Sequence, residues 1–333
     1  MGAECGPGAD RMSDAAMTTE AAGVSMPSIG LVKRLAYRVA DAWRFFIVAM
    51  PYLWLLVFFL VPFIIVLKIS FAKMMFAQPP YSPLFEWAED LELNIRITLS
   101  NFQFLTEDTL YWFGYLNSLK IAAISTVLCL LVGYPMAYGF ARAAPATRNT
   151  LLLLIILPFW TSFLLRIYAW MGMLNKQGII NNVLVWLGVI GEPIEMMNTD
   201  FAVYIGIVYS YLPFMILPLY ANLERMDIDL HEAAMDLGSK PWQVFIDVTL
   251  PLSMPGIIAG SLLVFIPATG EYVIPALLGD ASSPMIGRVL FDEFFYNRDW
   301  PVAAAVAVAL LLLLVIPIMF FQHYQGKEAG AGK

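Results

Sequence analysis

The sequence predicts an all-α integral membrane protein with six transmembrane helices, on three observations. Hydrophobic residues make up 60% of the 333 residues and charged residues only 14%, against roughly 45–50% and about 25% in a soluble globular domain. The mean hydropathy is +0.72. Six segments reach the length of about 20 apolar residues that crosses a hydrocarbon core about 30 Å thick. This composition excludes soluble enzymes and disordered scaffolds, because a soluble chain would expose large apolar patches.

The six predicted spans follow one another between two tails. Five of them contain no Asp, Glu, Lys or Arg, and the third contains one charge, Arg166. A transmembrane domain is therefore predicted over 45–322, with a largely disordered cytoplasmic tail over 1–44 and a short cytoplasmic tail over 323–333. In chain order the predicted spans are 45–67, 121–141, 150–175, 201–223, 248–270 and 300–322.

Positive residues gather on one side of the predicted spans. They lie in both tails and in the connections after the second and fourth spans, and include Arg44, Arg142, Arg148, Arg225 and Lys327. Because Lys and Arg are retained on the cytoplasmic side, we expect both termini to be cytoplasmic. The net charge of −7 gives no basic field for a nucleic acid. The two cysteines in the chain are expected as free thiols.

The connection over 224–251 is patterned like two short helices with a turn. Asp229 is a suitable N-cap for a helix over 230–237, and Gly238 stands where a left-handed residue ends a helix. Ser239 is a suitable cap for the helix that follows. Apolar side chains in this polar connection predict a docking element for another protein, with anchors at Leu230, Leu237, Trp242 and Phe245.

The same connection carries a motif of Glu-Ala-Ala, three residues, Gly, nine residues and then Val-x-Leu-Pro. It resembles the signature loop of the permease subunits of ATP-binding-cassette (ABC) importers, with Val in place of the usual Ile. The resemblance implies a type I importer bundle in which this cytoplasmic loop forms a coupling helix against the ATPase. The implied ATPase-coupling residues are Glu232, Ala233, Ala234, Gly238, Val248, Leu250 and Pro251.

Other segments resemble one branch of this family, the polyamine (putrescine/spermidine) permeases, most closely putrescine permeases that pair with a second permease. These segments are 158–170, 210–220, 270–275 and 297–301. The resemblance implies a bacterial inner-membrane subunit that passes putrescine, or next spermidine, from a periplasmic binding protein into the cytoplasm. The implied partners are a cytoplasmic ABC ATPase dimer and a second, homologous permease. Another small amine-bearing solute, and a homodimeric pore, stay open as alternatives.

The chain contains no motif for its own energy source or catalysis. No Gly-x-x-x-x-Gly-Lys-Ser/Thr loop is present, so ATP and Mg²⁺ are expected on the partner ATPase and no cofactor in this chain. His231-Glu232 begins like a zinc-protease motif, but Met235 replaces the second His, and no metal site is expected. An intramembrane enzyme or an ion-coupled secondary transporter is disfavoured, because the spans lack catalytic pairs and paired ionisable groups.

Two charges near the predicted outer ends of spans form the candidate substrate pathway or gate. Glu271 follows the fifth span and Arg166 lies in the third, and a charge at membrane depth must face protein or water. Glu271 either pairs with Arg166 to hold the outer gate shut or receives the ammonium of the substrate. In the second role, ring faces for cation–π contact would come from Tyr168, Tyr209, Tyr211 and Tyr272.

Overall fold

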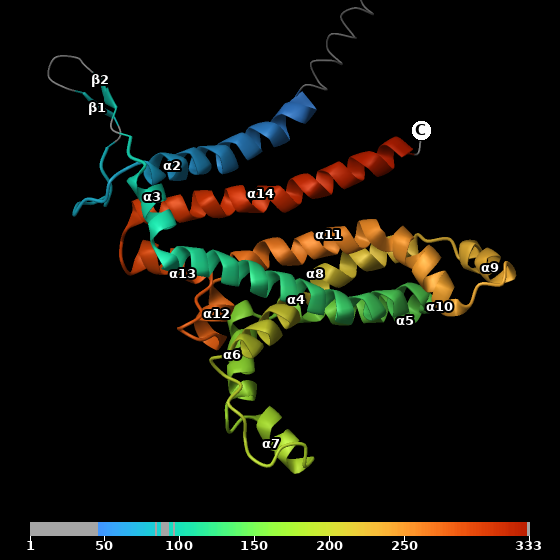
Figure 1. Cartoon of the computed structure of the whole chain (residues 1–333). Helices are drawn as coiled ribbons and strands as arrows, with labels where there is room; N and C mark the ends of the chain where they lie inside the picture. Colours follow the sequence, from blue (N-terminus) through green and yellow to red (C-terminus); the bar gives the residue numbers. More distant parts are fainter. Residues whose placement is uncertain (1–45, 84, 88–92, 96, 332–333) are drawn as a thin grey trace, which may run out of the picture. The chain divides into compact units, whose positions relative to one another are not determined.

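The computed structural model describes residues 46–83, 85–87, 93–95 and 97–331, and the predicted tail 1–44 lies outside this part (Figure 1). The chain divides between Pro62 and Phe63 into two compact units. Both contribute to the first helical span, Phe46–Ser70, which includes the π-helical turn η1 (Leu56–Leu60) and α2 (Val61–Ser70). A two-stranded antiparallel hairpin that the sequence did not predict follows, with β1 (Phe85–Trp87) paired to β2 (Leu93–Ile95).

The remaining regular elements of the described chain are helices. They are α3 (Ser100–Glu107), α4 (Thr109–Arg142), α5 (Pro145–Ile156), η2 (Leu157–Trp160), α6 (Phe163–Leu174), α7 (Ile179–Trp186), α8 (Asp200–Glu224), α9 (Asp229–Asp236), α10 (Pro241–Val244), η3 (Phe245–Thr249), α11 (Leu250–Thr269), α12 (Val273–Leu278), α13 (Ile286–Phe295) and α14 (Trp300–Ala331).

Five of the six predicted spans are recovered as single helices, and a bent pair of helices gives the sixth when it is counted as one span. The single helices long and apolar enough to cross a membrane, within the described residues, are Phe46–Ser70, Thr109–Arg142, Asp200–Glu224, Pro241–Thr269 and Trp300–Met319. The bent pair is Pro145–Trp160 with Phe163–Trp186. The predicted all-α membrane fold is therefore confirmed.

The third span differs from its prediction as one straight helix over 150–175. It bends by 92° between Trp160 and Phe163. Pro158 lies in the 3-10 turn η2, and the backbone is extended at Thr161 and at Ser162, with ψ of 152° and 134°. A proline cannot donate a backbone hydrogen bond in a helix, and here the Thr161 hydroxyl donates to the Pro158 carbonyl at 2.7 Å. Hydrophobicity alone gives no signal for such a break.

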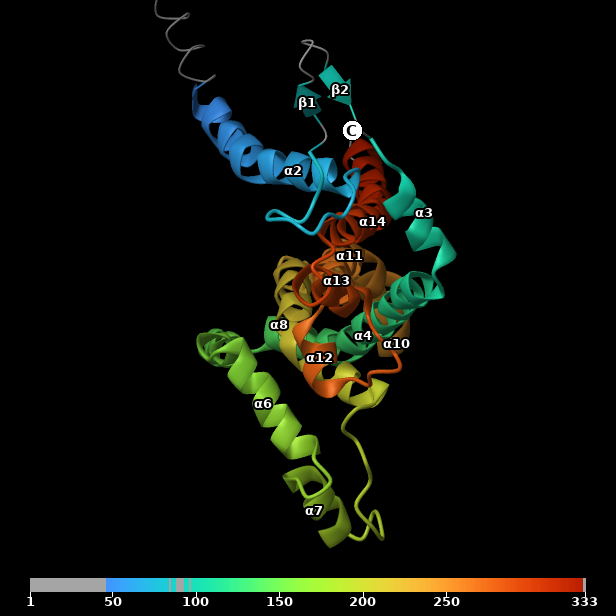
Figure 2. The same ribbon diagram turned by 90° about the vertical axis from the view of Figure 1, so that its left-hand side faces the viewer.

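Helices α4, α8 and α11 pack against one another and form the centre of the second unit (Figures 1 and 2). Their shared core is apolar and fully buried, and includes Cys129, Met215, Ile216, Leu219 and Val264. We call the end of this bundle at Arg142, Glu224 and Leu250 the α9 end, because α9 and α10 lie there. The opposite end, at Thr269, is the α12 end.

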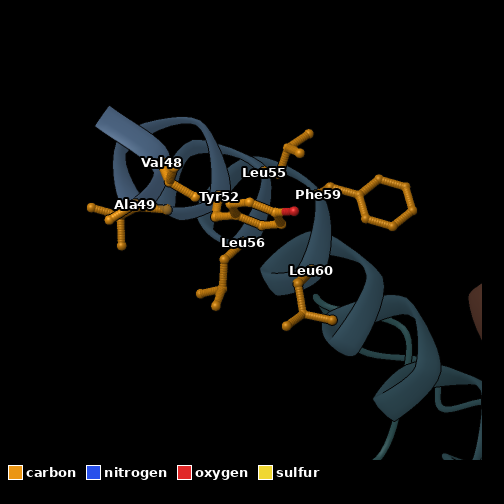
Figure 3. Close-up of a pocket in the computed structure, with 8 residues that line it drawn as sticks. Val48, Ala49, Tyr52, Leu55, Leu56, Phe59 and Leu60 are labelled. Atoms are coloured by element: carbon orange, nitrogen blue, oxygen red, sulfur yellow. The ribbon is translucent and has the colours of Figure 1, made fainter. Parts of the chain in front are cut away.

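In the first unit, the described helix exposes its apolar side chains. A shallow hollow along this helix is lined by side chains of that helix alone, Val48, Ala49, Tyr52, Leu53, Leu55, Leu56, Phe59 and Leu60 (Figure 3). Apart from the Tyr52 hydroxyl, these side chains offer no polar atom to a ligand. Such a surface is typical of a helix that is surrounded by hydrocarbon.

Candidate functional site

Helix α9 ends in the turn that the sequence predicts. Gly238 has a φ of +89°, and its N–H donates to the Met235 carbonyl at 2.9 Å while the Ser239 N–H donates to the Ala234 carbonyl at 3.1 Å. This pair of bonds is the Schellman motif, which requires a left-handed residue and favours glycine. The left-handed conformation predicted for Gly238 is confirmed.

The caps of the two short helices differ from the prediction. Helix α9 begins at Asp229 itself, so Ile228 is the N-cap residue, and the Asp229 N–H donates to Asp227 Oδ1 at 3.1 Å. Ser239 does not cap α10; instead the Lys240 N–H donates to Gln243 Oε1 at 2.8 Å. In both cases the free backbone N–H at the start of the helix donates to a polar side chain other than the one predicted.

The fifth span begins earlier than position 248. Helices α10, η3 and α11 form one continuous span from Pro241 to Thr269, so the second half of the motif, including Val248, lies within the span. Trp242 belongs to this span rather than to a separate loop. The connection between α8 and the fifth span is shorter than the predicted 224–251.

The exposed residues of the motif lie on α9, at the Gly238 turn and at the start of α11. Glu232 and Ala233 are exposed, whereas Ala234, Val248 and Leu250 are half-buried and Pro251 is exposed on α11. Large apolar side chains project beside α9, and Leu237 is 89% and Trp242 59% exposed. This apolar surface, formed by Leu230, Met235, Leu237 and Trp242, is called the α9 surface below.

At the α12 end, Glu271 makes hydrogen bonds within the protein. The side chain is 9% exposed. Its Oε2 accepts from the Tyr211 hydroxyl, and its Oε1 accepts from the N–H groups of Val273 and Ile274 at 3.0 and 3.4 Å. The carboxylate therefore caps α12, as acidic side chains do at helix N-termini, and joins it to Tyr211 of α8.

Arg166 is not paired with Glu271 in the described structure. Its guanidinium carbon lies 5.1 Å from the centre of the Phe159 ring and 5.6 Å from that of Phe163. These rings flank the bend of the third span, and the distances are those of cation–π contacts. Its Nε is buried and has no hydrogen-bond partner among the described residues.

Of the four candidate tyrosines, only Tyr211 is hydrogen-bonded to Glu271. Tyr272 stacks on Phe291 with ring centres 3.8 Å apart, and desolvation raises the pKa of its hydroxyl. Tyr209 packs against Trp170, and Tyr168 is half exposed on α6. No local sequence signal indicates that Tyr211 donates to a carboxylate 60 residues away.

Comparison with known proteins agrees with this architecture. Residues 22–328 match the family described as "Binding-protein-dependent transport system inner membrane component". The spermidine/putrescine transport system permease protein PotB of Haemophilus influenzae is 40% identical over 285 residues, which cover 84% of this chain and 93% of that protein. PotB of Escherichia coli K12 is 47% identical over 211 residues, 63% of this chain and 76% of that protein.

A solved structure has a similar fold. A chain from a bacterial alginate ABC transporter, in complex with an alginate pentasaccharide-bound periplasmic protein, superposes with a TM-score of 0.66 and 16% identity, over 87% of this chain and 96% of that chain. At this identity the likeness concerns the fold alone. With the match over residues 22–328, the chain belongs to the family of binding-protein-dependent transport system inner membrane components.

Proposed function

We propose that this protein is the permease subunit of an ATP-driven importer of polyamines, with putrescine favoured over spermidine. The observation that carries this proposal is the 40% identity to a spermidine/putrescine permease over 84% of the chain. The substrate enters from a periplasmic binding protein and leaves into the cytoplasm, and both termini lie on the cytoplasmic side. A second, homologous permease completes the pore.

The α9 surface is the proposed docking site of the ATPase. It presents exposed apolar side chains on and beside a helix that ends in a fixed turn, and Trp242 is of the residue type enriched in interface hot spots. The coupling residues are those of the motif: Glu232, Ala233, Ala234, Gly238, Val248, Leu250 and Pro251. ATP and Mg²⁺ are bound by that partner, and this chain acts only as the transport pathway.

Transport by the reconstituted assembly tests this function. The permeases, the ATPase and the binding protein are placed in liposomes, and uptake of labelled putrescine is measured with and without ATP. Unlabelled putrescine, spermidine and a neutral analogue of similar length are the competitors. We expect ATP-dependent uptake that the amines inhibit and the neutral analogue does not. Uptake by this chain alone, driven by an ion gradient, would contradict the proposal.

Glu271 is proposed as a residue of the substrate pathway or of its outer gate. In the described conformation its oxygens accept from Tyr211 and from the start of α12, so an ammonium would bind at a remaining lone pair of the carboxylate or displace the Tyr211 hydroxyl. Pairing with Arg166 would equally require a different conformation, since the two are not paired here. Tyr168, Tyr209 and Tyr272 are the ring faces proposed around this carboxylate.

One substitution separates the two roles of Glu271. Glu271→Gln keeps an acceptor for α12 but removes the charge. If the carboxylate binds substrate, inhibition of uptake by diamines weakens, while inhibition by a monoamine changes less. If it pairs with Arg166 in a gate, transport of every substrate falls, and the double variant with Arg166→Gln recovers part of it. Wild-type uptake in Glu271→Gln would exclude both roles.

A further inference from the structure

One side chain of α9 reaches inward to the spans. His231 is half-buried, while Glu232 and Ala233 beside it are exposed. Its Nε2 lies 2.9 Å from Thr249 Oγ1 and 3.3 Å from Arg142 Nη2. Thr249 is 1% exposed in η3, and Arg142 lies in the last turn of α4. Across the described residues, these are the hydrogen bonds that join α9 to α4 and to η3.

The Arg142 contact indicates which tautomer of the imidazole is favourable. A guanidinium has only donors, so its contact is favourable when Nε2 carries no hydrogen and accepts. In that tautomer the ring hydrogen is on Nδ1, and the Thr249 hydroxyl lies within hydrogen-bond distance both of this Nε2 and of the Val244 carbonyl, at 2.9 and 3.5 Å. Nδ1 is buried without a partner in the described structure, so this orientation is kept at an energetic cost.

Helix α4 and the η3 turn, which His231 contacts, also pack against each other deeper in the bundle. The Arg142 guanidinium carbon lies 5.4 Å from the centre of the Tyr138 ring, and Tyr138 contacts Phe245 of η3 with ring centres 6.4 Å apart. One turn deeper, Tyr134 packs edge-on against Phe245 and its hydroxyl lies 2.9 Å from Ser253 Oγ. A displacement of His231 therefore acts on a packed pair of helices rather than on one flexible side chain.

We propose that His231 is a positioning residue for the coupling of ATP hydrolysis to transport. Through its hydrogen bonds with Arg142 and Thr249, it transfers a movement of α9 to α4 and η3 together. This inference rests on the proposed function, because it assumes that the ATPase moves α9. The His231 side chain itself contacts the spans and is not part of the α9 surface.

The test is the coupling ratio, measured as amine imported per ATP hydrolysed by the complete reconstituted assembly. In His231→Ala we expect this ratio to fall about fivefold, the effect of losing hydrogen bonds between two moving parts. The amount of ATPase bound to the permease should stay at the wild-type level. His231→Gln, whose amide oxygen can accept from both donors, should restore most of the ratio. Asp236→Asn is the matched control on the same helix and should leave the ratio unchanged.

A double variant tests whether the hydrogen bonds of His231 are what transmits the movement of α9. Thr249→Val should lower the ratio, and His231→Ala with Thr249→Val should be no worse than His231→Ala alone, because both remove one contact. Additive losses, or an unchanged ratio in His231→Ala, would overturn the inference. If His231→Ala does not assemble, Thr249→Val and His231→Gln carry the test. Absence of ATP-driven import in the wild-type assembly would instead refute the proposed function.

Discussion

Two helix ends in this protein have the same local structure and different surroundings. Helices α7 and α9 each have eight residues, and each is followed by a leucine and a left-handed glycine. The Gly188 N–H donates to the Val185 carbonyl at 3.0 Å, the same bond that Gly238 makes after α9. The leucine is exposed in both, 59% for Leu187 and 89% for Leu237.

Helices α7 and α9 differ in the segments to which they are hydrogen-bonded. Helix α7 is anchored to the segment that follows it, since Asn181 donates to the Ile194 carbonyl at 2.9 Å and accepts from the Ile194 N–H at 3.0 Å. Helix α9 is hydrogen-bonded to the spans through His231, and the chain after Gly238 enters the fifth span at Pro241. For the coupling role proposed for α9, the distinguishing feature is therefore its hydrogen bonds to α4 and η3, since α7 ends in the same turn.

The largest effect on uptake is expected from substituting the left-handed glycine that follows α9. Gly238→Val forces a branched residue into a left-handed conformation, at a cost of roughly 1–2 kcal/mol, although no neighbouring atom lies within 4 Å of its Cβ. We expect the variant to insert at the wild-type level and to lose at least about tenfold in ATP-dependent uptake. Uptake by proteoliposomes with equal amounts of permease measures this.

Gly188→Val is the matched control, because Gly188 has a φ of +70° and an equally open Cβ position. It should be destabilised by a similar amount yet keep the coupling of hydrolysis to import. Equal losses of coupling in the two variants would mean that backbone strain anywhere, rather than the position of α9, stops transport.

A smaller effect is expected from the two leucines. Leu237→Ser removes the most exposed side chain of the α9 surface, and should weaken ATPase binding about tenfold, a typical effect for an interface anchor. Leu187→Ser should leave that affinity unchanged. Binding of the ATPase to permease in nanodiscs measures both. Neither variant should change the melting temperature by more than a few degrees, since both side chains are exposed. Wild-type ATPase affinity in Leu237→Ser would remove this residue from the docking site.

The smallest effect is expected from asparagine at the two glycine positions, and it tests why Gly238→Val lowers uptake. Asparagine tolerates the left-handed region better than other non-glycine residues. Gly238→Asn and Gly188→Asn should therefore retain most of the wild-type uptake, within about a factor of two. A complete loss in Gly238→Asn would show that the side chain itself obstructs the partner, and that backbone conformation is not what Gly238→Val disturbs.

Local features of this fold were predictable and distant pairings were not. Hydrophobic length predicted five of the spans as the single helices observed, and helix-ending chemistry predicted the left-handed Gly238. The bend at Thr161 depends on how Pro158 packs, which hydropathy does not record. His231 meets Arg142 across 89 residues, and Glu271 meets Tyr211 across 60. Such contacts follow from the packing of α4, α8 and α11, which no single segment encodes.

The continuity of the fifth span has a mechanical consequence. Pro241 and Thr269 are the ends of one helical span of 29 residues, which at about 1.5 Å per residue is about 43 Å long. If this span moves as a rigid rod, a tilt of about 5° about its α10 end displaces the opposite end by about 4 Å. Glu271 follows that far end by two positions, so a displacement of this size relative to α8 would separate its carboxylate from the Tyr211 hydroxyl.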